Sequence, residues 1–233
     1  MFLLALALAL HAPGSGVAAH GVHMPSIGFR YATQVDMETM STSDADSETA
    51  SKMHSVLHRV VISSNGTTIE TRNEGMMGVS GGELPISGST TYRLFFLVNT
   101  ELRVRAIPDQ PPVTNSTTWN CPTEGLDQFY PRGMARQVSL ACSVTGNVGG
   151  RVVGPTPVTV SFSDLGGSRD MTPAGAFDVR KLMVHAASAE MTNEITYDFA
   201  PALGISVVQN EKVSTSHIET MTHSEVSDFA PAP

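Results

Sequence analysis

The chain has 233 residues and a formal net charge of −8; 41% of its residues are hydrophobic and 15% are charged. This length and apolar content allow one sizeable domain with a real core, and they exclude a chain that is disordered throughout. The 14 basic residues are scattered singly, whereas a nucleic-acid-binding protein gathers them on one face to neutralise phosphates. We therefore expect no nucleic-acid partner.

The amino end predicts export. Residues 2–10 form an apolar run that is too short to span a bilayer, which needs roughly 20 residues. Val17 and Ala19 then supply the small side chains that favour cleavage before His20. No Lys or Arg precedes the apolar run, so either the true start lies upstream or the leader is atypical. We expect a signal peptide over residues 1–19 and a periplasmic or secreted mature chain.

The two cysteines, Cys121 and Cys142, both follow this leader. In an oxidising compartment two lone cysteines usually pair. Two buried free thiols are the alternative, while a metal site is disfavoured because the cysteines lack a paired CxxC spacing. We therefore expect a disulfide.

Alternation of apolar and polar residues dominates the rest of the chain and predicts β-strands. Asn65-Gly66 lies between β-rich flanks, which is a strong hairpin signal. Residues 52–62 also fit helical spacing, but their β-branched run favours strand. Strands are expected at 27–40, 53–73, 90–99, 101–107, 136–144, 156–163, 177–187, 193–200, 203–209 and 212–223, with turn-rich linkers at 76–89, 108–125 and 146–155.

We expect an all-β fold with little helix, namely a curved antiparallel meander that forms a half-barrel, an open barrel or a sandwich. Both parities of 92–98 are largely apolar, so this strand should lie centrally and be covered on both faces. The expected organisation is a flexible mature terminus at 20–26, one β domain at 27–223 and a flexible tail at 224–233. An outer-membrane barrel is disfavoured, because the strands show no continuous lipid-facing apolar parity.

Two motifs carry a resemblance. Residues 172–184 read TPAGAFDVRKLMV, and residues 193–213 contain the corner Ala200-Pro201 with Gly204. Together they resemble the closing section of a group of uncharacterised secreted bacterial β-rich envelope proteins, in which PAGxF is followed by an aromatic pair with APxxG. The resemblance implies an envelope location and the half-barrel architecture of periplasmic lipoprotein carriers. It implies no reaction.

We expect a non-catalytic protein without a cofactor, one that is not an integral membrane protein after the leader is removed. Its expected role is to bind an apolar or lipid-like ligand in a concave sheet, or a protein partner in the envelope; a structural or assembly role is an alternative. The candidate lining residues, chosen from apolar strand positions, are Tyr92, Leu94, Phe96, Met183, Tyr197 and Phe199.

Catalytic and metal motifs are weak. Ser80 fits G-x-S-x-G, but no helix can follow it as a nucleophile elbow requires. Cleavage before His20 would create an amino-terminal His, whose amine and imidazole bind copper; His54, His58 or His185 would then have to supply a further ligand. This start resembles that of copper-dependent polysaccharide monooxygenases and periplasmic copper carriers. A copper-binding protein or oxidase is therefore an alternative.

Overall fold

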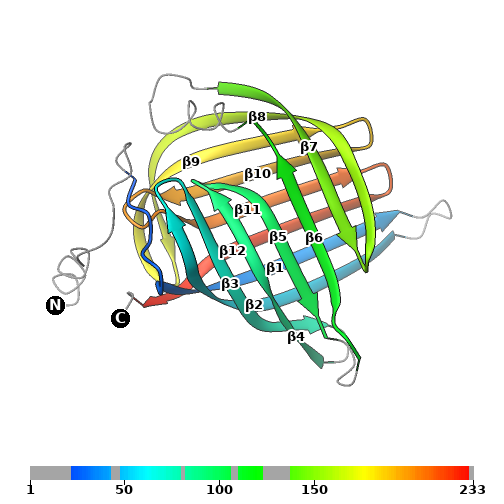
Figure 1. Ribbon diagram of the computed structural model, residues 1–233, viewed down its shortest axis with the longest axis horizontal. Helices are drawn as coiled ribbons and strands as arrows, with labels where there is room; N and C mark the ends of the chain where they lie inside the picture. The colour runs from blue at the N-terminus through cyan, green and yellow to red at the C-terminus, as the bar shows by residue number, and fades with distance from the viewer. Residues whose placement is uncertain (1–21, 43–47, 80–81, 106–109, 123–136, 231–233) are drawn as a thin grey trace.

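The computed structural model describes residues 22–42, 48–79, 82–105, 110–122 and 137–230, and it shows a closed barrel of antiparallel strands (Figure 1). Each strand pairs with its neighbours in the sequence, and the last strand pairs with the first. The strands are β1 (Arg30–Thr42), β2 (Glu48–Asn65), β3 (Thr68–Val79), β4 (Gly82–Arg93), β5 (Phe96–Val104), β6 (Val113–Asn120), β7 (Gln137–Val148), β8 (Arg151–Thr172), β9 (Gly175–Ala187), β10 (Met191–Ala200), β11 (Ile205–Thr215) and β12 (Ile218–Ala230).

Closure of the sheet corrects the expected half-barrel, open barrel or sandwich. β1 pairs with β2 along its whole length and with β12 from Arg30 to Ser41. Closure removes the exposed edges that an open meander leaves unpaired. Local alternation cannot show it, because the pairing joins residues up to 200 positions apart, such as Arg30 and Ala230.

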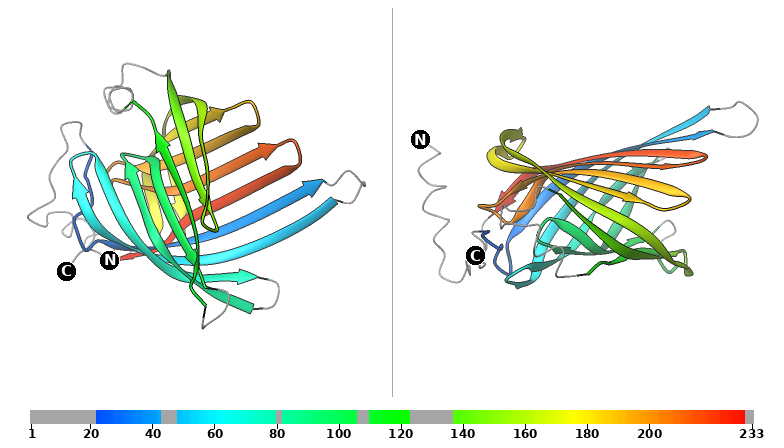
Figure 2. Two further views of the ribbon diagram at one scale, coloured as in Figure 1. Left: turned by 45° about the vertical axis from the view of Figure 1, so that its right-hand side comes forward. Right: turned by 90° about the horizontal axis from the view of Figure 1, so that it is seen from above.

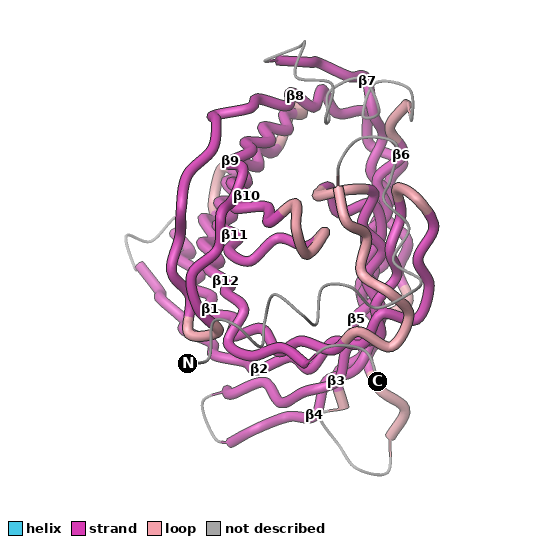
Figure 3. The backbone as a smooth tube through the Cα atoms, turned by 90° about the vertical axis from the view of Figure 1, so that its left-hand side faces the viewer, coloured by secondary structure: helices cyan, strands magenta, loops and turns pink. Residues whose placement is uncertain are grey.

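The barrel has two different ends, which we call the base and the rim. The base is the end at which β1 begins and β12 ends, and it also carries the turns after β2, β4, β8 and β10. The long hairpins in Figure 2 extend toward the rim. Viewed from the base, the strands form a ring, and the turn after β10 projects toward the middle of that ring (Figure 3).

The apolar stretch at 92–98 is not one central strand. β4 ends at Arg93, and Leu94 and Phe95 form a tight turn before β5. Leu94 has a φ of 56°, a left-handed conformation that is rare for a branched side chain. Burial explains both apolar parities: Leu94, Phe95 and Phe96 are all at most 2% exposed because the turn folds into the barrel.

All three expected linkers contain strand; in the one expected at 146–155, residues 146–148 end β7 and residues 151–155 begin β8. Residues 113–120, within the Pro-rich segment before Trp119, form β6, and residues 82–89 belong to β4. These segments are rich in Ser, Thr, Asn and Gly, so they lack the apolar alternation that marks a strand. Their backbone groups are satisfied by neighbouring strands, and Asn99 to Val104 on β5 pairs with β6.

Several local predictions are confirmed. Residues 52–62 belong to a strand, and Asn65-Gly66 lies at the turn of the β2–β3 hairpin. Cys121 and Cys142 form a disulfide with Cα atoms 4.4 Å apart, which ties the segment after β6 to β7. The described chain contains no helix long and apolar enough to cross a membrane.

The domain boundaries differ from the expectation. β12 continues to Ala230, so residues 224–230 are part of the barrel wall rather than a flexible tail. Near the amino end, Val22 and Met24 are buried, and the His23 amide donates to the Pro201 carbonyl at 3.0 Å. Residues 22–25 therefore pack over the β10–β11 turn at the base. The proposed leader, 1–19, lies outside the described residues.

The Ala-Pro corner and Gly204 have a structural purpose at this contact. Gly204 has a φ of +67°, and a Cβ at this position would lie 2.0 Å from the His23 carbonyl oxygen. We expect Gly204→Ala to lower the free energy of unfolding by more than about 1 kcal/mol, measured by urea denaturation. Gly66→Ala is the control, since a Cβ there meets nothing within 4 Å, and it should stay within about 0.5 kcal/mol. Equal effects of the two variants would contradict this account.

Candidate ligand-binding site

Strand register defines the inner face of the wall, because directly paired residues point to the same side. The largest buried side chains belong to paired inner positions, for example Tyr197 with Leu182, and Ile195 with Val184. Toward the rim the inner face becomes polar, and Ser55, Thr71, Asn73, Thr90 and Asn193 are buried there. The lumen therefore changes from aromatic at the base to polar above it.

Phe95 crosses the lumen from the β4–β5 turn. Its ring contacts Phe162 of β8, and Tyr197 and Phe199 of β10, at centroid distances of 6.2, 5.8 and 6.3 Å. β4 and β10 lie on opposite sides of the barrel order. Edge-on aromatic pairs at these distances stabilise the fold in addition to the stabilisation that comes from burying apolar area. The turn therefore acts as a plug that fastens the two walls together at the base.

A cavity of about 30 Å³ lies beside this plug. It is lined by both apolar and polar side chains, and neither Asp, Glu, His nor Cys is among its lining residues. They are Tyr31, Thr33, Arg59, Ile69, Tyr92, Leu94, Ile205, Ser206, Val207, Gln209 and Ser224. A buried space of this size holds about two water molecules or one small polar group.

Arg59 is the charged residue of the cavity. It lies on the inner face of β2 and pairs with Tyr31 of β1 and Asn73 of β3. Its Nη1 donates to the Tyr92 hydroxyl at 3.2 Å, and its Cζ lies 6.0 Å from the centre of the Tyr31 ring. Burial opposes the charged form, but the Tyr92 and Tyr31 phenols raise the pKa of Arg59 overall. The guanidinium is therefore a permanent charge inside the barrel.

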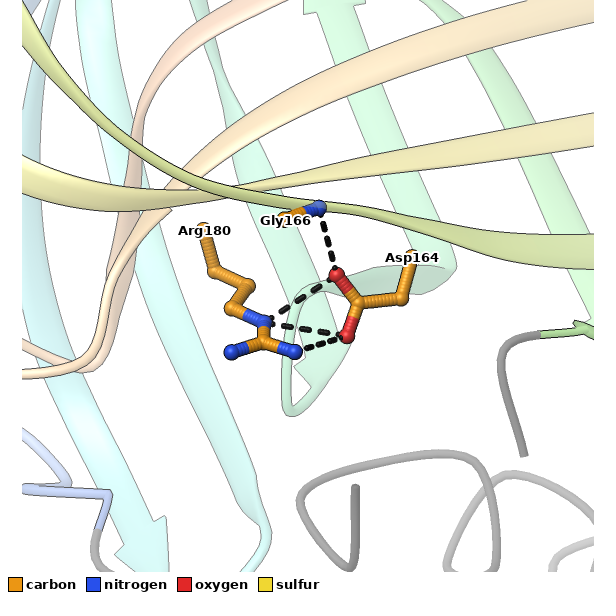
Figure 4. A network of polar contacts seen from close by, with 3 residues as sticks. All are labelled: Asp164, Gly166 and Arg180. Atoms are coloured by element: carbon orange, nitrogen blue, oxygen red, sulfur yellow. Dashed lines mark hydrogen bonds and ion pairs between the residues drawn. The ribbon is translucent and has the colours of Figure 1, made fainter. Parts of the chain in front are cut away.

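A second inner cation has a carboxylate partner. Arg180 of β9 forms a bidentate ion pair with Asp164 of β8, with Nε 3.0 and 2.9 Å from the two carboxylate oxygens (Figure 4). The same carboxylate accepts from the Gly166 amide at 2.9 Å, at the bulge of β8. Bidentate pairing fixes both side chains, so this pair stabilises the wall and leaves little charge for a ligand.

Glu211 is an inner-face carboxylate on β11. It accepts from Asn193 Nδ2 at 2.7 Å and pairs across the strands with Ile195. Burial raises the pKa of Glu211, and the bond from Asn193 offsets only part of that rise. The carboxyl group is therefore held in a place that favours its neutral form.

A third cluster lies on the opposite face of β9 and β10. Lys181 lies 3.3 Å from Asp170 and 3.5 Å from Asp198. Burial, and then a hydrogen bond with Asp170, raises the pKa of Asp198 to about 6. The same hydrogen bond and the Lys181 charge hold the pKa of Asp170 below its usual range. The environment of Asp198 therefore favours its neutral form below about pH 6, and that of Asp170 favours the charged form.

The sequence-predicted lining residues fall in three places. Tyr92 and Leu94 lie in the wall of the cavity. Phe96, Tyr197 and Phe199 are fully buried in the aromatic core of the base. Met183 is half-buried and pairs with Thr196, on the face opposite to Leu182.

Arg59 and Tyr31 were missed by the sequence analysis. The alternation of side chains could have identified Arg59, since it occupies the same side of its strand as the apolar residues Leu57 and Val61. A charge on an apolar parity is less common than a charge on a solvated one. The neighbouring His54 and His58 have the other parity and are exposed, and His54 Nδ1 lies 2.8 Å from Asp36.

The structure does not test the candidate copper ligand or the candidate nucleophile. His20 and Ser80 lie outside the described residues. Within the described ranges, no group of three or more His, Cys, Asp or Glu side chains could hold a metal ion. The copper hypothesis therefore stays a prediction from the sequence.

A groove of about 560 Å³ crosses β1, β2, β10, β11 and β12 toward the rim. Most of its side chains have the outer parity, including Glu194, Thr196, Asn210 and Lys212. Lys52 pairs with Glu38 at 3.3 Å there, and His223 Nδ1 lies 2.7 Å from Asn210 Oδ1. This groove is shallow, exposed and internally paired, in contrast to the cavity at the base.

Comparison with known proteins finds no matching family model and no matching curated protein. Among solved structures, the hypothetical lipoprotein YmcC from Escherichia coli (K12) has a TM-score of 0.45 and 10% identity, over 87% of this chain and 85% of that one. An outer membrane channel from Pseudomonas putida F1 has a TM-score of 0.26 and 10% identity, over 86% and 96%. The translocator domain of autotransporter NalP from Neisseria meningitidis has a TM-score of 0.24 and 8% identity, over 96% and 95%. At these scores the likenesses identify neither a family nor a function for this chain.

The plug predicts a large cost for removing Phe95. Phe95→Ala should lower the free energy of unfolding by about 3–5 kcal/mol, because it leaves a cavity among three rings from two strands, β8 and β10. Phe177→Ala is the matched control, since Phe177 is only half-buried and meets one ring, Phe229, at 6.0 Å. Chemical denaturation measures both. A cost for Phe95→Ala no greater than that of the control would show that the turn does not fasten the walls.

The Asp198 cluster predicts a pH effect. A carboxyl whose pKa is raised in the folded state stabilises the fold below its unfolded pKa, and this contribution is lost as the pH rises through about 6. The advantage of Asp198→Asn in melting temperature should therefore grow between pH 4 and pH 7. Glu211 titrates in both proteins and cancels from this difference. Asp178→Asn, at a side chain 90% exposed, is the control, and a difference independent of pH for Asp198→Asn would contradict the assignment.

Proposed function

We propose that this protein is an exported, non-catalytic β-barrel of the bacterial envelope that binds a lipid-like ligand, with the head of the ligand seated at the base of the lumen. The observation that carries the proposal is the cavity beside the Leu94–Phe95 turn. Its lining includes the polar side chains of Arg59, Tyr92 and Gln209 and apolar side chains such as those of Leu94 and Val207. Such a mixed lining suits an amphiphile.

The distribution of side chains over the two faces supports a barrel in water rather than in a bilayer. Outer positions carry charges, and Asp36, Lys52 and Arg72 are exposed there. Cross-strand ion pairs such as Lys212–Glu219, at 2.8 Å, lie on the same face. A transmembrane barrel instead shows an apolar outer band. A soluble barrel that shields a ligand in its interior fits this pattern.

The disulfide supports location outside the cytoplasm. Cys121–Cys142 persists in an oxidising compartment such as the periplasm. The apolar run at residues 2–10 and the resemblance to secreted envelope proteins agree with that location, and both remain predictions from the sequence. The absence of Asp, Glu, His and Cys from the cavity lining agrees with binding rather than catalysis.

The test is to fill the cavity and measure what the protein retains. Ser224 lines the cavity from β12, and Ser224→Trp should occupy it. Native mass spectrometry of protein purified from its envelope fraction, or reloaded with 1-dodecanol, should show a lipid-sized adduct whose affinity falls by about tenfold or more in the variant, a loss of about 1.4 kcal/mol.

Ser139→Trp is the matched control, because Ser139 is exposed and pairs with Ser161 on the outer face. It should bind as the wild type does, with both variants checked for folding by circular dichroism. Absence of an adduct in the wild type under every loading condition would contradict the proposal, as would equal retention by Ser224→Trp and wild type.

A further inference from the structure

We propose that Arg59 makes the base of the lumen an oxyanion site, so that the ligand carries a single carboxylate or phosphate head. This inference deepens the proposed function and rests on it for the chain of the ligand. The charge of Arg59 is the starting point, because a cation enclosed by a barrel is costly unless it has a partner.

The partners of Arg59 do not neutralise it. Its described contacts are the Tyr92 hydroxyl and the ring and phenol of Tyr31, and in the described part of the chain it forms no ion pair with Asp or Glu. Burial raises the pKa of Tyr31, so that phenol stays neutral at physiological pH. The inner pair Asp164–Arg180 shows the contrast, because there the guanidinium is matched by a carboxylate.

Unused hydrogen-bond donors face the same cavity. The Nε of Arg59 and the Oγ of Ser206 are buried without a hydrogen-bond partner. Tyr92 accepts from Arg59 Nη1, so its own hydroxyl hydrogen is free to donate. Three donors and a positive charge thus border one space, and no carboxylate lines it to compete. An anion with two or three oxygens satisfies this set better than water does.

Cavity size and lining restrict the ligand further. A volume of about 30 Å³ admits a carboxylate or a phosphate oxygen cluster, but not an acyl chain. Ile69, Leu94 and Ile205 border the same space. A chain attached to the head would therefore meet these apolar side chains first. A monoacyl carboxylate or an alkyl phosphate has this combination of features.

The experiment compares ligands of equal chain and different head. Isothermal titration with the wild type should show that dodecanoate binds about tenfold or more tighter than 1-dodecanol. Arg59→Gln should lose that preference, bringing the two affinities within about twofold of each other, while Arg59→Lys, which keeps the charge, should retain part of it. Inorganic phosphate and acetate are titrated as competitors; displacement by either would show that a free oxyanion suffices.

The outcomes separate the two proposals. Equal affinities of dodecanoate and 1-dodecanol for the wild type would overturn the oxyanion site while leaving the lipid-binding function intact. Binding of phosphate without binding of either amphiphile would support the oxyanion site and reject the lipid-like ligand. Absence of binding by all four compounds would overturn both. The wild-type comparison needs no variant, so it decides between these outcomes even if Arg59→Gln folds poorly.

A stability measurement gives a second readout. Removing a half-buried cation that lacks a counter-ion relieves a desolvation cost, so Arg59→Met without ligand should melt at or above the temperature of the wild type. Addition of dodecanoate should raise the melting temperature of the wild type by more than it raises that of Arg59→Met. If Arg59→Met loses much stability and dodecanoate raises its melting temperature as much as that of the wild type, Arg59 has a purely structural role.

Discussion

The contact of Phe95 with the opposite wall is the interaction on which the rest of the site depends. A barrel of twelve strands is wider than the eight-stranded barrels whose own side chains fill them. The β4–β5 turn meets this constraint by folding inward, so that Phe95 reaches Phe162, Tyr197 and Phe199. The strained Leu94 conformation that this requires is offset by burial of three consecutive apolar side chains.

This plug also creates the cavity. Leu94, held by the hydrogen bond from its amide to the Thr67 carbonyl at the adjoining turn, forms one side. The start of β11 supplies Ile205 and Ser206 from the other side, and residues 22–25 cover the β10–β11 turn. Arg59 and Tyr92 are thereby enclosed between the wall and the plug. The same packing that closes the base therefore builds the polar recess next to it.

Local sequence patterns predicted the all-β class, the Asn65-Gly66 hairpin, the strand at 52–62 and the cysteine pair, because each depends on neighbouring residues or on the compartment. They could not predict closure, which depends on pairing between the first and last strands. They also failed at Leu94–Phe95, where a buried turn interrupts the alternation of apolar and polar residues. At residues 113–120 they failed because a polar strand shows no such alternation. At the site, apolar residues such as Leu94 were found by parity. Arg59 was missed because the sequence pattern does not show that its side of the strand faces a closed lumen.

The most direct measurement of the central claim is nuclear magnetic resonance of the 15N-labelled protein, with dodecanoate labelled with 13C at its carboxyl carbon. We predict that the signals of the Arg59 Nε–H group and of the Tyr92 and Leu94 backbone amides shift on binding. Magnetisation transfer should also be detected between the Arg59 Nε–H proton and the labelled carboxyl carbon. Residues of the outer groove, such as Thr196 and Asn210, should not shift. Shifts confined to that groove, with the Arg59 signal unchanged, would contradict a ligand site at the base of the lumen.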